Sequence, residues 1–201
     1  MSATAIRNIA VIGLGTIGHS VVQMFATADC CVRCFDPSPA ARDGLESRIR
    51  GNLNQMVDAN LFIQEDIETL LGQITICDTE KEALVGAEFV SEAASEDLEL
   101  KQALFSRMEE SVDVETILAS NTSTHPMTHI AGLMKYPARA IVTHPFNPPH
   151  IIPVVEVVPG EKTSEKTTEL ATSLLRRVGK QPVRLSKELP GFLVNRIQMA
   201  M

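Results

Sequence analysis

The sequence has no cluster of basic residues, no long apolar run and few cysteines. Its 18 lysines and arginines are interspersed among 25 acidic residues, which gives a net charge of −7 over 201 residues. A nucleic-acid partner is therefore not expected, because nucleic-acid-binding proteins gather Lys and Arg into a patch that meets the phosphates. No apolar stretch approaches the ~20 residues that span a bilayer, and the first residues lack the regions of a secretory signal. We expect a cytoplasmic protein with no membrane partner.

The two separated cysteine pairs of a typical zinc site are also missing. Three of the four cysteines lie together in CCVRC, residues 30–34, and the fourth, Cys77, stands apart. Zinc sites use separated pairs such as C-x-x-C, whereas these cysteines alternate with apolar residues as in a buried strand. We expect reduced thiols in the core and no metal.

Short apolar runs alternate with amphipathic stretches along the chain, whose hydrophobic share is 44%. The run over 6–15 is typical of a strand buried on both faces, residues 16–28 of a helix and residues 31–36 of a second strand. Further strand patterns cover 74–77, 88–93, 116–120, 138–146, 153–158 and 182–186. Helical patterns cover 39–59, 64–72, 79–86, 97–112 and 164–178. By the crossover rule, this alternation predicts an α/β fold: a Rossmann-type, doubly wound and mostly parallel sheet with helices on both faces.

The turn GLGTIG, residues 13–18, follows the first predicted strand and opens the first predicted helix. Gly13, Gly15 and Gly18 have the G-x-G-x-x-G spacing, and Thr16 and Ile17 complete the turn. In this context the first glycine permits a tight turn, the second a close approach of a pyrophosphate, and the third close helix–strand packing. The helix N-terminus offers free N–H groups and the positive end of its dipole to the phosphates. The motif predicts a dinucleotide site; a glycine-rich turn without a ligand is the alternative.

Asp36 closes the second predicted strand. A carboxylate at this place accepts hydrogen bonds from the ribose hydroxyls and repels a 2′-phosphate, which favours NAD over NADP as the cofactor. Arg33 and Arg42 lie on either side of it, so an arginine clamp for a phosphate stays open, although the residues directly after Asp36 are PSP rather than basic.

The segment ASNTS, residues 119–123, follows another predicted strand and so belongs to the carboxyl edge of the sheet, where ligands of doubly wound folds bind. Asn121 there can bond the cofactor or the substrate. It can equally cap the helix that follows, as can Ser123 or Thr124.

A single carboxylate, Glu156, lies among valines in a predicted strand. Burying it without a partner costs several kcal/mol, on the order expected for an isolated ion, so a partner is needed. His144 ends the preceding predicted strand, and PFNPP after it turns the chain back. A carboxylate behind an imidazole fixes its tautomer and raises its basicity, which suits a base that takes a hydroxyl proton. The alternative is a half-exposed edge strand with Glu156 facing water.

These segments together resemble the NAD-dependent L-3-hydroxyacyl-CoA dehydrogenase family. The resemblance is closest to its branch with L-gulonate 3-dehydrogenase, lambda-crystallin, L-carnitine dehydrogenase and 3-hydroxybutyryl-CoA dehydrogenase-like members, and it covers essentially the whole chain. It rests on GLGTIG, Asp36, SEAASEDLELKQALF, ASNTST, THPFNPPHIIPVVEVV and KELPGFLVNR, in that order.

The resemblance implies a function and a set of roles. The reaction is NAD-dependent oxidation of the 3-hydroxyl of a 3-hydroxy acid or 3-hydroxyacyl-CoA to the 3-keto product. His144 removes the hydroxyl proton, Glu156 orients it, and Ser123 and Asn195 hold the substrate oxygen. Cofactor contacts fall on the glycine turn and on Asp36, Glu96, Lys101 and Asn121.

Family members continue past the NR motif into an all-helical domain that dimerises and closes the substrate cleft. We therefore expect residues 1–189 to form the NAD-binding domain and residues 190–201 to be the first turns of a truncated helical domain. Such a chain binds NAD but turns over poorly alone, and forms a homodimer when the second domain is present. A CoA substrate needs basic residues for its phosphates: Arg48 and Arg50 are candidates, or they belong to a solvated helix face. An NAD-binding structural protein of the crystallin kind, or a regulatory one, is the alternative function.

Overall fold

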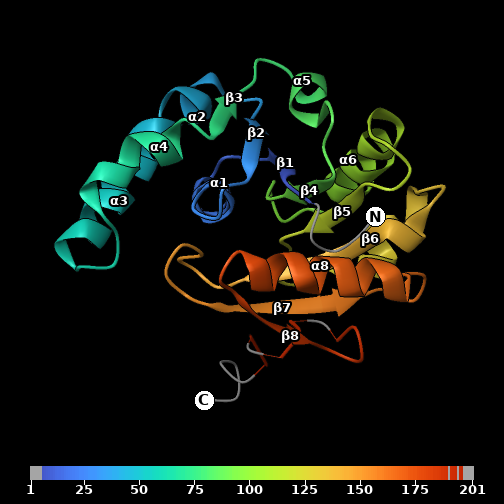
Figure 1. Ribbon diagram of the computed structural model, residues 1–201. Coiled ribbons are helices and arrows are strands. Elements are labelled where there is room, and N and C mark those ends of the chain that lie inside the picture. The colour runs from blue at the N-terminus through green and yellow to red at the C-terminus, as the bar shows by residue number, and fades with distance from the viewer. Residues whose placement is uncertain (1–5, 190, 194, 197–201) are drawn as a thin grey trace.

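The computed structural model describes residues 6–189, 191–193 and 195–196 (Figure 1). The described residues form one eight-stranded sheet of order β3-β2-β1-β4-β5-β6-β7-β8. The strands are β1 (Asn8–Ile12), β2 (Cys31–Phe35), β3 (Ile74–Ile76), β4 (Phe89–Glu92), β5 (Ile117–Ser120), β6 (Ala140–Pro145), β7 (Val154–Pro159) and β8 (Gln181–Arg184). Neighbouring strands are parallel except β6 and β7, which pair antiparallel. This confirms the predicted fold class.

Helices connect the strands and cover the sheet (Figure 1). They are α1 (Gly18–Ala26), α2 (Pro39–Asp43), α3 (Leu45–Asp58), α4 (Ile67–Leu71), α5 (Glu80–Leu84), α6 (Leu98–Ser111), α7 (Met127–Ile130) and α8 (Glu165–Arg177). Short 3-10 turns lie at η1 (Gln64–Asp66), η2 (Ala131–Leu133) and η3 (Pro137–Arg139). The single helix predicted over 39–59 is interrupted at Gly44, which ends α2 and begins α3. Within the described ranges, no helix combines the length and apolar character needed to cross a bilayer.

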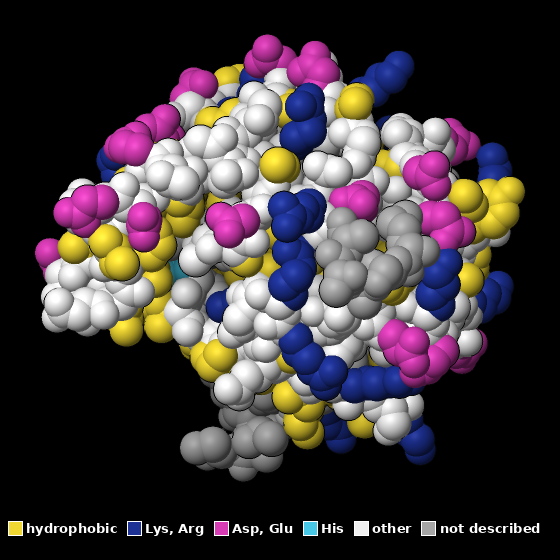
Figure 2. All heavy atoms as spheres, viewed as in Figure 1, with side chains coloured by type: hydrophobic (Ala, Val, Ile, Leu, Met, Phe, Trp, Pro, Cys, Tyr) yellow, Lys and Arg dark blue, Asp and Glu magenta, His cyan; other side chains and the backbone are white. Residues whose placement is uncertain are grey.

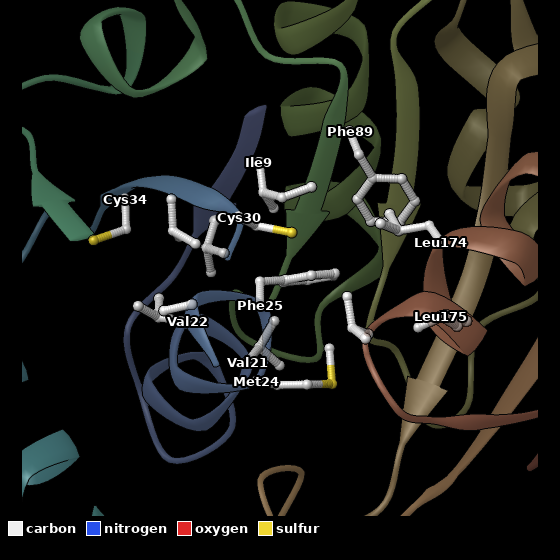
Figure 3. Packing of buried hydrophobic residues seen from close by; sticks show 14 of the residues in the cluster. Ile9, Val21, Val22, Met24, Phe25, Cys30, Cys34, Phe89, Leu174 and Leu175 are labelled. Carbon is white, nitrogen blue, oxygen red and sulfur yellow. The ribbon is translucent and has the colours of Figure 1, made fainter. Parts of the chain in front are cut away.

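Side chains on the two faces of the sheet enter two separate hydrophobic clusters. In β1, Ile9 and Val11 belong to the cluster under α1, α3 and α8, whereas Ala10 and Ile12 belong to the one under α5 and α6. Figure 3 shows the first cluster, in which Phe25 of α1 meets Phe89 of β4 with ring centroids 5.9 Å apart. The uninterrupted apolar run of β1 therefore arises because both of its faces are covered.

The cysteines divide between core and surface. Cys30, Cys34 and Cys77 are buried free thiols, and burial raises the pKa of Cys34 to about 12. Cys31 is exposed, so the expectation of core thiols was wrong for this residue. The reason is the alternation of β2: Val32 and Cys34 enter the core, which turns Cys31 the other way. Among the described residues, no group of three His, Cys, Asp or Glu side chains is arranged to hold a metal.

The surface visible in Figure 2 carries charges of both signs. Lys and Arg side chains gather in a column across the middle of this face, and acidic side chains lie along the upper rim and on the right. The segment with α3 and α4 projects at the left of both views. Beyond α3 it exposes two apolar side chains, Leu61 and Ile63.

Candidate cofactor and active site

The glycine turn lies between β1 and α1, and its glycines meet different surroundings. Gly13 has a φ of +97°, and a Cβ there would lie 2.6 Å from the carbonyl of Ala93. At Gly18 a Cβ would lie 1.9 Å from the carbonyl oxygen of Gly13, so the third glycine also serves the closure of the turn itself. At Gly15 a Cβ would meet no atom within 4 Å. Two glycines are thus required by packing, and Gly15 leaves room for a ligand to approach the backbone, as a pyrophosphate requires.

Asp36 stands at the end of β2 next to this turn. Its Oδ2 accepts a hydrogen bond from the backbone N–H of Leu14 at 2.7 Å, and its Oδ1 accepts one from Ser38 at 2.8 Å. Both bonds hold the carboxylate at the cavity that the glycine turn lines, and each oxygen keeps a further lone pair for a ribose hydroxyl.

The two arginines flanking Asp36 are both engaged with backbone carbonyls. Arg33 donates to the carbonyl of Glu82 at 2.9 Å. Arg42 donates to the backbone carbonyl of Asp36 at 2.7 Å and lies over the ring of Phe35, 5.7 Å from its centroid. Neither guanidinium binds the carboxylate of Asp36, which lines the cavity and stays available for ribose hydroxyls, in agreement with NAD as the cofactor.

Two adjoining cavities follow the carboxyl edge of the sheet. The first, of about 520 Å³, is lined by the glycine turn, Asp36, apolar side chains, Ser95 and the ion pair of Glu80 and Arg107. The second, of about 840 Å³, is lined by polar side chains of β6, of the loops after β4, β5 and β6, and of the segment after residue 190: Glu96, Asn121, Ser123, His144, Asn147 and Asn195. Both cavities touch Ile17, Ala93 and Ala94. The crevice therefore has one part with the features of an adenosine site and another with hydrogen-bonding groups and an imidazole.

His144 and Glu156 lie directly opposite each other in the antiparallel pair β6–β7. Nδ1 of His144 lies 2.7 Å from Oε2 of Glu156, and the two residues are 7% and 1% exposed. The half-exposed edge strand that the sequence left open is absent here, because β8 pairs with β7 on its other side and Glu156 is buried. In the neutral imidazole, Nδ1 donates to the carboxylate, so the lone pair is on Nε2. This is the arrangement of a base and its orienting acid.

Two aromatic rings and a backbone N–H complete the surroundings of this pair. The rings of Phe146 and Phe192 lie 5.0 and 5.7 Å from the imidazole centroid. Gly191 and Phe192 both adopt positive φ, which turns the Phe192 ring into the core. The N–H of Leu193 donates to Oε1 of Glu156 at 2.9 Å. Glu156 thus binds both the imidazole and the segment that follows residue 190.

Glu96 organises the loop that holds Asn121 and Ser123. Its Oε1 accepts hydrogen bonds from the hydroxyls of Thr122 and Thr124, at 2.6 and 2.7 Å, and from the N–H groups of Ser123 and Thr124. Burial acts to raise the pKa of Glu96, but these donors and the charge of Lys101 outweigh it and lower the pKa to about 2. Glu96 is therefore ionised throughout the physiological range.

The polar residues of this loop do not cap α7, which begins after Pro126 with no side-chain cap. Asn121 instead donates from Nδ2 to the hydroxyl of Ser91 at 2.8 Å and to the carbonyl of Glu92 at 2.6 Å. The side chain of Asn195 reaches the same loop, donating to the carbonyl of Ser123 at 3.3 Å. The residues expected to hold substrate oxygen are therefore neighbours across the cavity that contains His144.

Lys101 does not lie where it could contact a cofactor directly. It is 1% exposed and lines neither cavity. Its Nζ lies 2.8 Å from Oε1 of Glu92 and 3.4 Å from Oε2 of Glu96. Glu92, which is fully buried, also accepts from the hydroxyl of Ser120 at 2.6 Å. In this structure Lys101 therefore supports the loop that carries Glu96, through its contacts with Glu92 and Glu96.

Glu92 was missed from the sequence, although the signal was present. It is a carboxylate at the end of an apolar strand, as Glu156 is a carboxylate within one, and the same rule that burial demands a partner applies. Thr122 and Thr124 carried no such signal, because hydroxyls in a loop have many uses.

The fold and the glycine turn define a Rossmann-type dinucleotide-binding domain. The chain belongs to the 3-hydroxyacyl-CoA dehydrogenase family: residues 8–189 match the family model described as 3-hydroxyacyl-CoA dehydrogenase, NAD binding domain. This confirms the family resemblance and NAD as the cofactor.

Individual relatives support the same family. The chain is 35% identical to an L-carnitine dehydrogenase of Streptomyces coelicolor, over 98% of this chain and 60% of that protein. It is also 35% identical to the human lambda-crystallin homolog, over 100% of this chain and 63% of that protein. A solved (S)-3-hydroxybutyryl-CoA dehydrogenase from Ralstonia eutropha superposes with a TM-score of 0.91 at 29% identity, over 96% of this chain and 68% of that one. The chain thus spans about three fifths of the length of the two curated relatives.

Proposed function

We propose that this chain supplies the NAD site and the catalytic His–Glu pair of an oxidoreductase acting on a 3-hydroxy acid or 3-hydroxyacyl-CoA. The observation that carries the proposal is the 2.7 Å contact between His144 and Glu156 at the wall of the larger cavity, beside the glycine turn. The names of an L-carnitine dehydrogenase and a 3-hydroxybutyryl-CoA dehydrogenase among similar proteins support the same chemistry.

The bound NAD would supply the hydride acceptor. The residues expected to hold it are the glycine turn for the pyrophosphate, Asp36 for the ribose, and Glu96 and Asn121 beside the nicotinamide end. Lys101 acts through Glu96. The protein's contribution is to align the cofactor and the substrate and to manage the proton.

The proton passes to His144 in the direction of oxidation. Nε2 of the imidazole takes the proton of the substrate hydroxyl, and Glu156 stabilises the imidazolium that forms. The hydroxyl of Ser123 and the amide of Asn195 hold the substrate oxygen as it gains carbonyl character. In the reverse direction the same imidazolium returns the proton.

Arg48 and Arg50 do not support a CoA thioester over a free acid. Arg48 donates to four backbone carbonyls, those of Leu14, Gly15, Ala41 and Gly44. Arg50 pairs with Glu46 and Glu68 on the surface. Neither guanidinium is held ready for the phosphates of CoA, so the proposed substrate class includes both free acids and CoA thioesters.

We further propose that residues 1–189 form the cofactor domain, and that residues 190–201 begin a helical domain through which the protein forms a homodimer. Residues 190, 194 and 197–201 of this segment lie outside the described residues. An NAD-binding protein without turnover is the second candidate, favoured by the similarity to the human lambda-crystallin homolog.

The test is a substrate panel with NAD, in which 3-hydroxybutyryl-CoA, L-gulonate and L-carnitine are compared by the absorbance of NADH. It uses this chain and, in parallel, the complete gene product. We expect turnover of one class by the complete product and weak turnover by the chain alone. NAD binding without turnover of any 3-hydroxy compound would overturn the proposal and leave the second candidate.

A further inference from the structure

Arg48 of α3 reaches back to the glycine turn, although it lies 34 residues from Leu14 in the sequence. Its Nη1 donates to the carbonyl of Leu14 at 2.8 Å and to that of Gly15 at 3.4 Å. On its other side, Nη2 donates to Ala41 at 2.7 Å and Nε to Gly44 at 3.2 Å. The guanidinium thus ties the glycine turn to the junction between α2 and α3.

All these partners are neutral carbonyl oxygens. Among the described residues, no carboxylate forms an ion pair with Arg48, whereas Arg50 two positions on is paired with Glu46 and Glu68. The positive charge of Arg48 is therefore not cancelled by a direct acidic partner. Asp36 is bound to the same stretch of backbone, but through the N–H of Leu14 rather than through Arg48.

The two carbonyls of the turn belong to the peptide groups whose N–H donors are those of Gly15 and Thr16. A cationic donor on a carbonyl polarises the peptide group, and so strengthens its N–H as a donor. Gly15 and Thr16 line the smaller cavity, and a Cβ at Gly15 would meet no atom within 4 Å. Arg48 thus contacts the carbonyl oxygens of peptide groups that belong to the wall of this cavity.

A second donor strengthens the same arrangement. Nδ1 of His19 lies 3.0 Å from the carbonyl oxygen of Gly15, which therefore accepts from both His19 and Arg48. His19 belongs to the first turn of α1, whose N-terminus already presents the positive end of a helix dipole. The charge of Arg48 adds to that field at the place where an anion binds.

We propose that Arg48 is a positioning residue for the pyrophosphate of NAD: it holds the glycine turn from behind and adds its positive charge to the anion site without touching the cofactor. The role concerns binding and does not depend on the oxidation proposed above. It is also a different use of Arg48 from a contact with the phosphates of CoA.

The test measures NAD binding by isothermal titration calorimetry at low and high salt, on the wild-type chain and on Arg48→Met, Arg48→Lys and Arg50→Met. Arg50→Met removes the same charge from the same helix, and so controls for net charge. Removal of one charge near a dianion at short range is expected to raise the Kd of Arg48→Met about tenfold at low salt. The salt dependence of NAD binding should also become shallower for this variant, because one cation no longer acts on the phosphates.

Two further comparisons separate this role from a purely structural one. Adenosine, which has no phosphate, should bind Arg48→Met and wild type within about twofold, since its affinity contains no charge term. Arg48→Lys keeps the positive charge but loses the planar guanidinium that binds several carbonyls at once. NAD binding by this variant should therefore retain the wild-type salt dependence, with a Kd between those of wild type and Arg48→Met. If Arg48→Met does not fold, as judged by circular dichroism, the lysine variant and its salt dependence decide alone.

The proposal is overturned if Arg48→Met binds NAD like Arg50→Met. It is equally overturned if NAD and adenosine weaken by the same factor, which would mean that Arg48 only shapes the adenosine pocket. For the lysine variant, a loss of salt dependence despite the retained charge contradicts it.

Discussion

His144 and Glu156 are cross-strand partners in the one antiparallel pair of the described sheet, with Nδ1 and Oε2 2.7 Å apart. The reversal of the chain after Pro145 produces this pairing, because it returns β7 alongside β6 with the carboxylate opposite the imidazole. The rest of the sheet, which is parallel, would have required a crossover helix to bring two such residues together.

Replacement of His144 by Ala should abolish most hydride transfer while NAD binding persists. Loss of a positioned general base costs about 10²–10⁴ in rate. The measurement is kcat by NADH absorbance together with the Kd for NAD by calorimetry. His129→Ala, at a histidine outside the cavities, is the matched control. A variant at His144 that keeps wild-type kcat would remove the imidazole from the mechanism.

Asp36→Ala should weaken NAD binding and relax the preference against NADP. Loss of hydrogen bonds from a charged acceptor to ribose hydroxyls corresponds to about 1.5–3 kcal/mol each, or roughly 10- to 100-fold in Kd. Asp43→Ala, on exposed α2, is the control. Equal losses for NAD and NADP would indicate that Asp36 serves the turn through Leu14 rather than the ribose.

Glu92 and Lys101 form a buried ion pair, and replacing only one of them should lower the free energy of unfolding more than replacing both. Lys101→Met leaves the buried Glu92 without its cation, for which we expect about 3–5 kcal/mol lost from the free energy of unfolding, and Glu92→Gln should cost less because Lys101 keeps its contact with Glu96. The double variant should lose less than the sum of the two. Urea unfolding measures all three, and Lys135→Met, at an exposed ion pair with Glu110, is the control, with an expected loss of about 0–1 kcal/mol. Additive losses would show that the two charges do not depend on each other.

Glu96 should contribute a distinct step to acid denaturation. Its pKa is about 2 in the folded protein against an ordinary value of 4.5, because hydrogen bonds and Lys101 outweigh burial. A folded-state pKa that is depressed adds stability that is complete above pH 4.5 and is lost as the pH falls from 4.5 towards 2. The difference in free energy of unfolding between wild type and Glu96→Gln should therefore shrink over this interval. A constant difference across these pH values would contradict the assignment.

The sequence predicted the parts of the molecule that follow local patterns. The strand–turn–helix context placed Gly13–Gly18 and Asp36 at one cavity, and the isolated carboxylate in an apolar run placed Glu156 against His144. Contacts between residues that are far apart in the chain and follow no repeating pattern could not be predicted from the sequence. Arg48 on the glycine turn is one, and the N–H of Leu193 on Glu156 is another. In both, a backbone group is the partner, and backbone groups carry no residue-specific signal in a sequence.

The carboxylate of Glu156 is a rigid plane with the imidazole on one oxygen and the backbone of Leu193 on the other. A displacement of the chain at Leu193 must either stretch its own bond or rotate that plane, and rotation re-aims the ring of His144. The orientation of the imidazole and the course of the polypeptide beyond the sheet are thus mechanically linked, so that the proposed proton acceptor is aimed by whatever holds Leu193 in place.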